Sequence, residues 1–188
     1  MKLSGSYQIK LEKQKVWEAL NNPEILKKSI PGCEEFNKKS ETEFTATATN
    51  KIGPFNATFI GDIELMDLNP PNSYKITGAG NSPVGFANGE ATVTLEDFEG
   101  GTKLNYSVEA NVGGKIAQIG SRLIDMTAKK MADIFFGKFS ELISANTPNH
   151  EIKKSEENKI STKDKSVNKI FIISSAIILA GIALYYFR

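Results

Sequence analysis

The 188-residue sequence contains one cysteine, one histidine and almost no net charge. A disulfide needs two thiols, so the single Cys33 excludes an internal disulfide and an all-cysteine metal site. The single His150 excludes a multi-histidine zinc site and weakens any serine–histidine–aspartate scheme. The 23 Lys and Arg residues are balanced by 22 Asp and Glu residues. The chain therefore lacks the basic excess of many nucleic-acid-binding proteins, and we expect no nucleic-acid partner.

Few polar residues form a pattern that is typical of catalysis. A lone cysteine such as Cys33 is usually a small buried hydrophobe, and the sequence offers it no activating base. We interpret His150 as a solvated side chain. Asp125 and Asp133 are interpreted as solvated carboxylates, with a paired-carboxylate site as the alternative. We therefore predict no catalytic residue, no metal site and no enzymatic activity.

A long apolar run occupies residues 170–187, which read IFIISSAIILAGIALYYF and contain no charged side chain. A helix of this length is about 27 Å long, close to the thickness of the hydrocarbon core of a bilayer. A buried core helix is the alternative, but the run follows a polar segment. The pattern therefore predicts a transmembrane tail anchor over residues 170–188.

The segment before this run is polar and rich in lysine. Residues 146–169 have few apolar side chains to bury, which is typical of a flexible linker, here a basic one. Residues 146–188 carry seven basic and four acidic residues, whereas residues 1–145 carry 16 and 18. Because lysines favour the cytoplasmic side of a span, we expect a cell-membrane protein with one C-terminal span and a cytoplasmic N-terminal domain. The N-terminus has no continuous apolar stretch, so no signal peptide is expected.

Residues 1–145 form the expected globular domain. Their pattern predicts a strand at 2–10, helices at 11–20 and 23–28, short strands between 33 and 112, and a long helix at 115–145. This order indicates an α+β fold in which the long helix packs on a curved antiparallel sheet. Since such a helix would be about 46 Å long, we expect a kink or a free end in it.

The apolar positions of these strands include many small residues, namely Ala46, Ala48, Ala57, Gly61, Gly78, Ala91 and Ala110. Small side chains between a sheet and a helix leave a void, and an empty void costs about 24 cal/mol per Å³. We therefore predict a ligand cavity lined by Phe55, Phe59, Phe86, Tyr106, Ile116, Ile119 and Leu123. The alternative is that the helix lies close enough to fill the space. Arg122 is a candidate to contact the polar group of a ligand, with a surface salt bridge as its alternative role.

Several strings of the domain match one known family. They are VWEAL at 16–20, NPEIL at 22–26, IPGC at 30–33 and VGGKIAQIGSRLI at 112–124. Over about residues 1–145 the chain resembles the carbon monoxide dehydrogenase G-subunit family. The resemblance implies a START-like helix-grip fold of the polyketide cyclase-like superfamily, in which a curved sheet wraps a long C-terminal helix around a hydrophobic cavity.

The resemblance also implies a function. Members look like accessory proteins of molybdenum-containing carbon monoxide dehydrogenases or related hydroxylases, associated with membrane anchoring of the enzyme and with binding of a hydrophobic quinone. Together with the apolar tail, this predicts a membrane-anchored binding protein for a quinone or lipid, without a covalent cofactor. A membrane adaptor that recruits a redox enzyme without binding a ligand is the alternative. A cyclase or hydrolase on the same fold is a third interpretation, which the lack of histidine in the domain disfavours.

Overall fold

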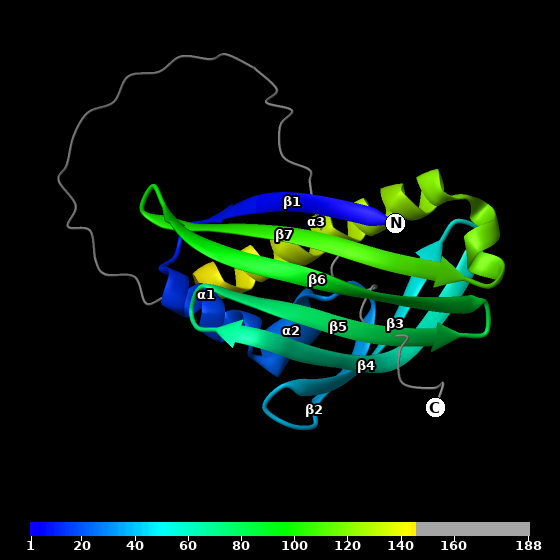
Figure 1. Ribbon diagram of the computed structural model, residues 1–188, viewed down its shortest axis with the longest axis horizontal. Helices are drawn as coiled ribbons and strands as arrows, with labels where there is room; N and C mark the ends of the chain where they lie inside the picture. Colours follow the sequence, from blue (N-terminus) through cyan, green and yellow to red (C-terminus); the bar gives the residue numbers. More distant parts are fainter. Residues whose placement is uncertain (146–188) are drawn as a thin grey trace, which may run out of the picture.

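The computed structural model describes residues 1–145, in which seven antiparallel strands form one curved sheet around a long helix (Figure 1). In chain order the elements are β1 (Lys2–Ile9), α1 (Lys13–Leu20), α2 (Pro23–Ser29), β2 (Cys33–Lys38), β3 (Glu43–Ile52), β4 (Phe55–Asn69), β5 (Ser73–Ser82), β6 (Gly85–Phe98), β7 (Gly101–Gly113), η1 (Lys115–Ile119) and α3 (Ser121–Ala145). The strands follow the order β1-β7-β6-β5-β4-β3-β2. This is the α+β helix-grip arrangement that the sequence predicts.

The strands form because apolar and polar residues alternate along them. In β3, Phe44, Ala46 and Ala48 are buried, whereas the threonines between them are partly exposed. Successive side chains of a strand point to opposite faces, so this alternation gives the sheet one buried face. The register places Phe44 opposite Ile63 and Ala46 opposite Gly61. The apolar residues of neighbouring strands therefore meet on the same inner face.

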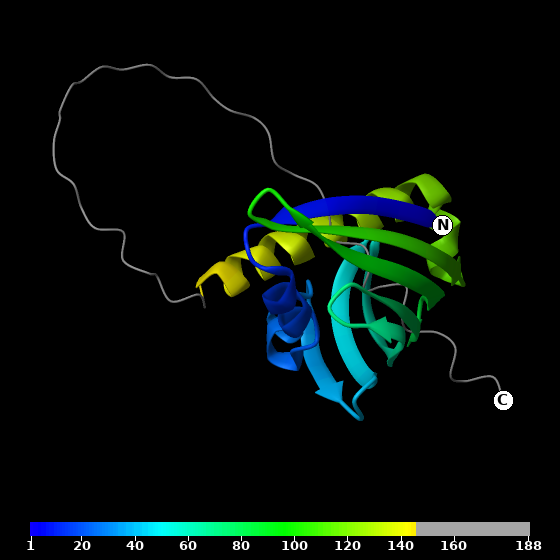
Figure 2. The same ribbon diagram turned by 60° about the vertical axis from the view of Figure 1, so that its left-hand side comes forward.

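The second short helix, α2, begins at a capped N-terminus. The side-chain oxygen of Asn22 accepts hydrogen bonds from the backbone N–H groups of Glu24 and Ile25, at 3.0 and 3.4 Å. Pro23 occupies the first turn, where the helix needs no backbone donor. The helix packs against α3 and β2, and Figures 1 and 2 show α1 and α2 beside one end of the sheet. These two helices therefore cover one end of the space between the sheet and α3.

The long helix expected at residues 115–145 is divided into two segments in the structure. Lys115–Ile119 forms the 3₁₀ turn η1, and α3 starts at Ser121. Gly120 between them has a φ of 89°, a backbone conformation that glycine reaches without steric cost. The chain direction therefore changes at Gly120, which is where the expected kink lies.

Two large apolar clusters fill the inner side of the sheet, and a small third cluster of Ala128 and Ala132 packs against Met1 and Leu3. The first joins α1 and α2 to the C-terminal half of α3, through Phe135, Phe136 and Phe139. The second lies at the other end, near η1, and contains Phe59 and Ile116. No helix within residues 1–145 has both the length and the apolar character that crossing a bilayer requires. The linker and the tail anchor, predicted at 146–169 and 170–188, lie outside the described residues and stay predictions.

Candidate functional site

An apolar cavity of about 70 Å³ lies between the sheet, α3 and the two N-terminal helices. Its lining is Leu20, Leu26, Ile30, Phe36, Phe44, Ile63, Leu65, Tyr74, Ile76, Val93, Leu104, Phe135 and Phe136. Within this lining, Tyr74 is the one residue whose side chain carries a polar atom. The cavity is therefore suited to an apolar group, with a single hydroxyl beside it.

Tyr74 is held on β5 by an aromatic neighbour from α1. Its ring packs edge-on against the ring of Trp17, with the ring centroids 5.3 Å apart. Burial raises the pKa of the Tyr74 phenol above its ordinary value, because the ionised form would lose its hydration. The hydroxyl therefore stays protonated at physiological pH, and it is suited to donate a hydrogen bond to a carbonyl oxygen.

Aromatic rings from three elements form one wall beside the cavity. Phe136 of α3 stacks on Tyr7 of β1, with the ring centroids 4.1 Å apart, and lies 5.9 Å from the ring of Tyr106 on β7. A Cβ atom at Gly5 would lie 2.5 Å from the hydroxyl oxygen of Tyr106. The Tyr106 ring therefore occupies the space that a side chain at position 5 would need.

A carboxylate lies near this aromatic wall. The Oδ1 atom of Asp133 on α3 is buried and has no hydrogen-bond partner within residues 1–145. Desolvation raises the pKa of the Asp133 carboxyl, and the neighbouring Lys129 opposes this shift. The pKa of Tyr106 is raised by burial and then by the charge of Asp133. The ionised form of a side chain is therefore disfavoured where Asp133 lies near the aromatic wall.

The structure brings together three of the eight predicted ligand-binding residues, although none of the eight lines the 70 Å³ cavity. Phe59 and Ile116 are buried in the second apolar cluster, and Ile119 packs against it. Tyr106 lies in the first cluster, in the aromatic wall. Phe59, Ile116 and Ile119 thus lie at the η1 end of the sheet, whereas the cavity lies at the end that α1 and α2 cover.

The other predicted residues lie nearer the surface. Phe55 is partly buried, Arg122 is exposed, and the side chains of Phe86 and Leu123 are 37% and 38% exposed. A Cβ atom at Gly113 would lie 2.2 Å from the Phe86 ring, so Phe86 lies over a residue without a side chain. Arg122 forms no ion pair with any residue of the part that the structure describes.

Sequence reasoning missed the residues that line the cavity. One signal was available, because Phe135, Phe136 and Phe139 bring three rings to nearly one side of a helix, where residues three and four apart are neighbours. These three rings mark the bulkiest part of α3. The contributions of α1 and α2 to the lining depend on where these helices pack, which the sequence pattern does not contain.

Two of the candidate catalytic groups, Cys33 and Asp125, lie on different elements, β2 and α3. Cys33 is partly buried, burial raises its pKa, and its thiol contacts the Glu35 carbonyl oxygen at 3.2 Å. Asp125 is exposed, and His150 lies outside the described residues. Over residues 1–145, no group of three or more His, Cys, Asp or Glu side chains is placed to hold a metal ion.

Comparisons with known proteins identify the family and the fold. The family profile of CoxG, the carbon monoxide dehydrogenase G-subunit, matches residues 5–144. A solved protein from Geobacillus kaustophilus is 32% identical, with a TM-score of 0.74, and the match covers 77% of this chain and 96% of that one. A protein from Nitrosomonas europaea is 16% identical, with a TM-score of 0.59 and coverage of 78% and 96%.

A third solved structure, Ara h 8.0201, is 16% identical with a TM-score of 0.56, and the match covers 78% of this chain and 99% of that one. The two matches at 16% identity show the shared fold alone. A search of curated proteins finds no match to the chain. The profile match spans nearly all of the described domain, and the match to the Geobacillus kaustophilus protein covers 77% of the chain at 32% identity. The chain therefore belongs to the CoxG family of carbon monoxide dehydrogenase subunits.

Proposed function

We propose that this chain binds a hydrophobic ligand, a quinone or a lipid, at the membrane and serves a carbon monoxide dehydrogenase-like molybdenum hydroxylase as an accessory protein. The observation that carries the proposal is the apolar cavity between the sheet, α3 and the two N-terminal helices. Burial of apolar surface contributes about 25 cal/mol per Å², so a ligand that enters this space needs no charged partner. The family supports the accessory role and the enzyme partner.

A cavity of about 70 Å³ is small beside the roughly 300–1,000 Å³ of most ligand pockets. The cavity must therefore expand when a ligand enters it. The inner face of the sheet offers that room, because the register pairs Ala46 with Gly61, Gly61 with Gly80, and Gly80 with Ala87. This band of small residues crosses four strands, directly beside the cavity-lining pair of Phe44 and Ile63. A flat ring is able to lie against it with little steric hindrance.

The single hydroxyl in the lining supports a role in orienting the ligand. Tyr74 is protonated at physiological pH, since burial raises its pKa. A neutral phenol donates a hydrogen bond to a carbonyl oxygen, which a quinone carries and an alkane chain lacks. In this proposal Tyr74 binds the head group of the ligand, while the apolar walls bind the rest.

Membrane attachment belongs to the same proposal. The tail anchor predicted at residues 170–188 would hold the domain beside a bilayer, where a hydrophobic ligand is concentrated. The adaptor function remains the second candidate, because the cavity volume of about 70 Å³ is small for a ligand site. Deleting residues 146–188 separates the two. A binding protein still takes up ligand in solution, whereas an adaptor without its anchor loses every function.

The deciding experiment is mass spectrometry of organic extracts from the purified full-length protein. We expect a stoichiometric quinone or lipid in the wild-type extract. Ile76→Trp places a larger side chain in the cavity, and Ile60→Trp makes the same change on the exposed side of β4. We expect Ile76→Trp to lose the ligand and Ile60→Trp to retain it. Each variant is checked by thermal unfolding, because overpacking costs about 1–3 kcal/mol. Extracts without any apolar small molecule, or equal ligand in both variants, would contradict the proposal.

A further inference from the structure

Three segments that are far apart in the sequence meet at the end of the sheet opposite α1 and α2. They are the β3–β4 turn, the β5–β6 turn, and η1 with the start of α3, at the right-hand end of Figure 1. A Cβ atom at Gly53 would lie 3.4 Å from side-chain carbons of Ile119 and Leu123. The N–H of Ile116 donates a hydrogen bond to the carbonyl oxygen of Val84 at 2.9 Å. The three segments therefore form one continuous surface.

Large apolar side chains are exposed on this surface. Met126 is 60% exposed, and Phe86 and Leu123 are exposed by more than a third. Pro54 and Pro83, at the two turns, are exposed as well. Scattered apolar residues are normal on a protein surface, but a cluster of them marks a place where something else binds.

The charged side chains of the same segments are mainly basic. Lys51, Lys115 and Arg122 are exposed there, and Asp125 is the one acidic residue of these segments. None of the three cations forms an ion pair with another residue in the described range. We refer to Phe86, Leu123 and Met126 with Lys51, Lys115 and Arg122 as the apolar–basic end surface.

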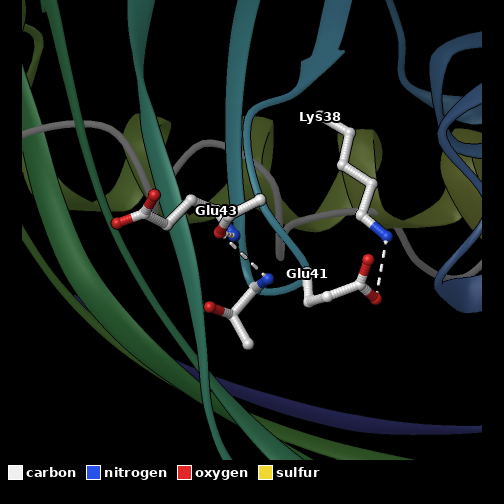
Figure 3. Close-up of polar contacts among 5 residues, drawn as sticks. Lys38, Glu41 and Glu43 are labelled. Atoms are coloured by element: carbon white, nitrogen blue, oxygen red, sulfur yellow. Dashed lines mark hydrogen bonds and ion pairs between the residues drawn. The ribbon is translucent and has the colours of Figure 1, made fainter.

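The opposite end of the sheet has a different character. At the β2–β3 turn, Lys38 lies 3.3 Å from Glu41 (Figure 3), and Lys39 lies 3.0 Å from Asp62. Beside the β6–β7 turn, Lys13 lies 3.1 Å from Asp97. Exposed lysines without an ion pair in the described residues also occur at that end, namely Lys10, Lys15, Lys27 and Lys28. The η1 end differs because its cations lie beside Phe86, Leu123 and Met126, three of the six large apolar residues that are exposed within residues 1–145.

We propose that the apolar–basic end surface docks on a lipid bilayer that contains anionic headgroups. The apolar side chains of Phe86, Leu123 and Met126 enter the boundary between headgroups and acyl chains, while the three cations meet lipid phosphates. A fluid bilayer fits this surface because the apolar side chains lie on separate turns with cations among them, and lipids need no matching pocket to surround each one. The contact requires neither a bound ligand nor the predicted tail anchor, so it stands apart from the proposed function.

The test is co-sedimentation with vesicles of phosphatidylcholine, with and without phosphatidylglycerol. It uses residues 1–145, because the Geobacillus kaustophilus protein, 96% of which is covered by the match, folds with little beyond this domain. We expect binding to the anionic vesicles that weakens with added salt. Leu123→Glu with Met126→Glu should weaken it about tenfold or more. The matched control is Ile60→Glu, which makes the same change at a residue that is 62% exposed on β4, and it should leave binding unchanged.

Circular dichroism confirms that each variant is folded, and the single Met126→Ser provides a milder change at the most exposed of the three apolar positions. Three results would overturn the proposal. One is wild-type protein that stays in the supernatant with every vesicle. Another is an equal loss of binding in Ile60→Glu. The third is a wild-type protein that binds no vesicle but forms a dimer in sedimentation velocity, with the dimer absent in the double variant. That result would assign the surface to a second copy of the chain.

Discussion

The ring of Tyr7 on β1 stacks on the ring of Phe136 on α3, with centroids 4.1 Å apart and 19° between the ring planes. β1 is an edge strand that pairs only with β7 in the sheet. The stack therefore ties the inner face of this edge strand to the helix that the sheet surrounds. Because Phe136 also lines the apolar cavity, one ring contributes both to the stability of the domain and to the wall of the proposed site.

Phe136→Ala removes this ring, and we expect it to lower the free energy of unfolding by about 3–5 kcal/mol. The loss arises from buried apolar surface and from the void that remains. Chemical denaturation of the purified protein measures it. Ile134→Ala is the matched control, because Ile134 lies on the same helix and is 47% exposed; its effect should stay within about 0.5 kcal/mol. Similar small losses in both variants would show that the stack does not support the fold.

Two glycines near α3 should respond in opposite ways to alanine. An added Cβ atom meets nothing within 4 Å at Gly120 or at Gly137, but Gly120 has a φ of 89°. Gly120→Ala should therefore lose about 1–2 kcal/mol of stability, because a side chain is strained in this conformation. Gly137 lies inside α3, so Gly137→Ala should gain about 0.5–1 kcal/mol. Denaturation midpoints that move in the same direction would contradict this assignment.

The partly buried carboxylate of Asp133 should make stability depend on pH. Desolvation raises its pKa above 3.8 in the folded state, so the folded state binds the proton more tightly than the unfolded state. The cost of burying the charge is fully present above the folded pKa and disappears as the pH falls below the unfolded value. Asp133→Asn should therefore raise the free energy of unfolding at neutral pH and have no such benefit below pH 3.8. Urea denaturation across this range measures the difference.

Asp125→Asn supplies the baseline for this measurement, because Asp125 is an exposed carboxylate on the same helix. The gain in Asp133→Asn should exceed the change in Asp125→Asn at neutral pH. A gain that persists unchanged in acid would mean that the substitution acts through packing and not through the charge.

The cap of α2 should contribute measurably to stability. Asn22→Ala removes the oxygen that accepts hydrogen bonds from Glu24 and Ile25, and we expect a loss of about 1 kcal/mol. Asn22→Asp keeps an acceptor at the same position and should retain most of the stability. Thermal unfolding of both variants measures the effect. An equal loss in the aspartate variant would show that the cap is not the cause.

The fold was largely predictable from the sequence because its signals are local. The alternation of Phe44, Ala46 and Ala48 with threonines indicates a strand with one buried face, and Asn22 before Pro23 marks the start of a helix. The break at Gly120 was only partly predictable. Glycine permits a positive φ, but the expected kink had no assigned position until the packing of η1 on Val84 and the β3–β4 turn placed it there.

The candidate site was less predictable than the fold. Strand alternation identified Phe59 and Tyr106 as inward-facing, and helical spacing identified Ile116; all three are buried. The same reasoning placed Leu123 and Phe86 in a cavity lining, whereas both are substantially exposed. Apolar character indicates that a residue avoids water in some environment. Apolar character does not distinguish the lining of a cavity from a surface that binds another molecule or a membrane.

The sequence by itself determined the family, the order of strands and helices, and the inner face of the sheet, because periodicity and short motifs depend on neighbouring residues. Only the tertiary structure decided which end of the sheet is enclosed. α1 and α2 pack beside the C-terminal half of α3 and cover the cavity there, and the exposed Phe86, Leu123 and Met126 lie at the other end. That choice arises from contacts between elements far apart in the chain, such as α2 with α3. No local pattern contains such contacts.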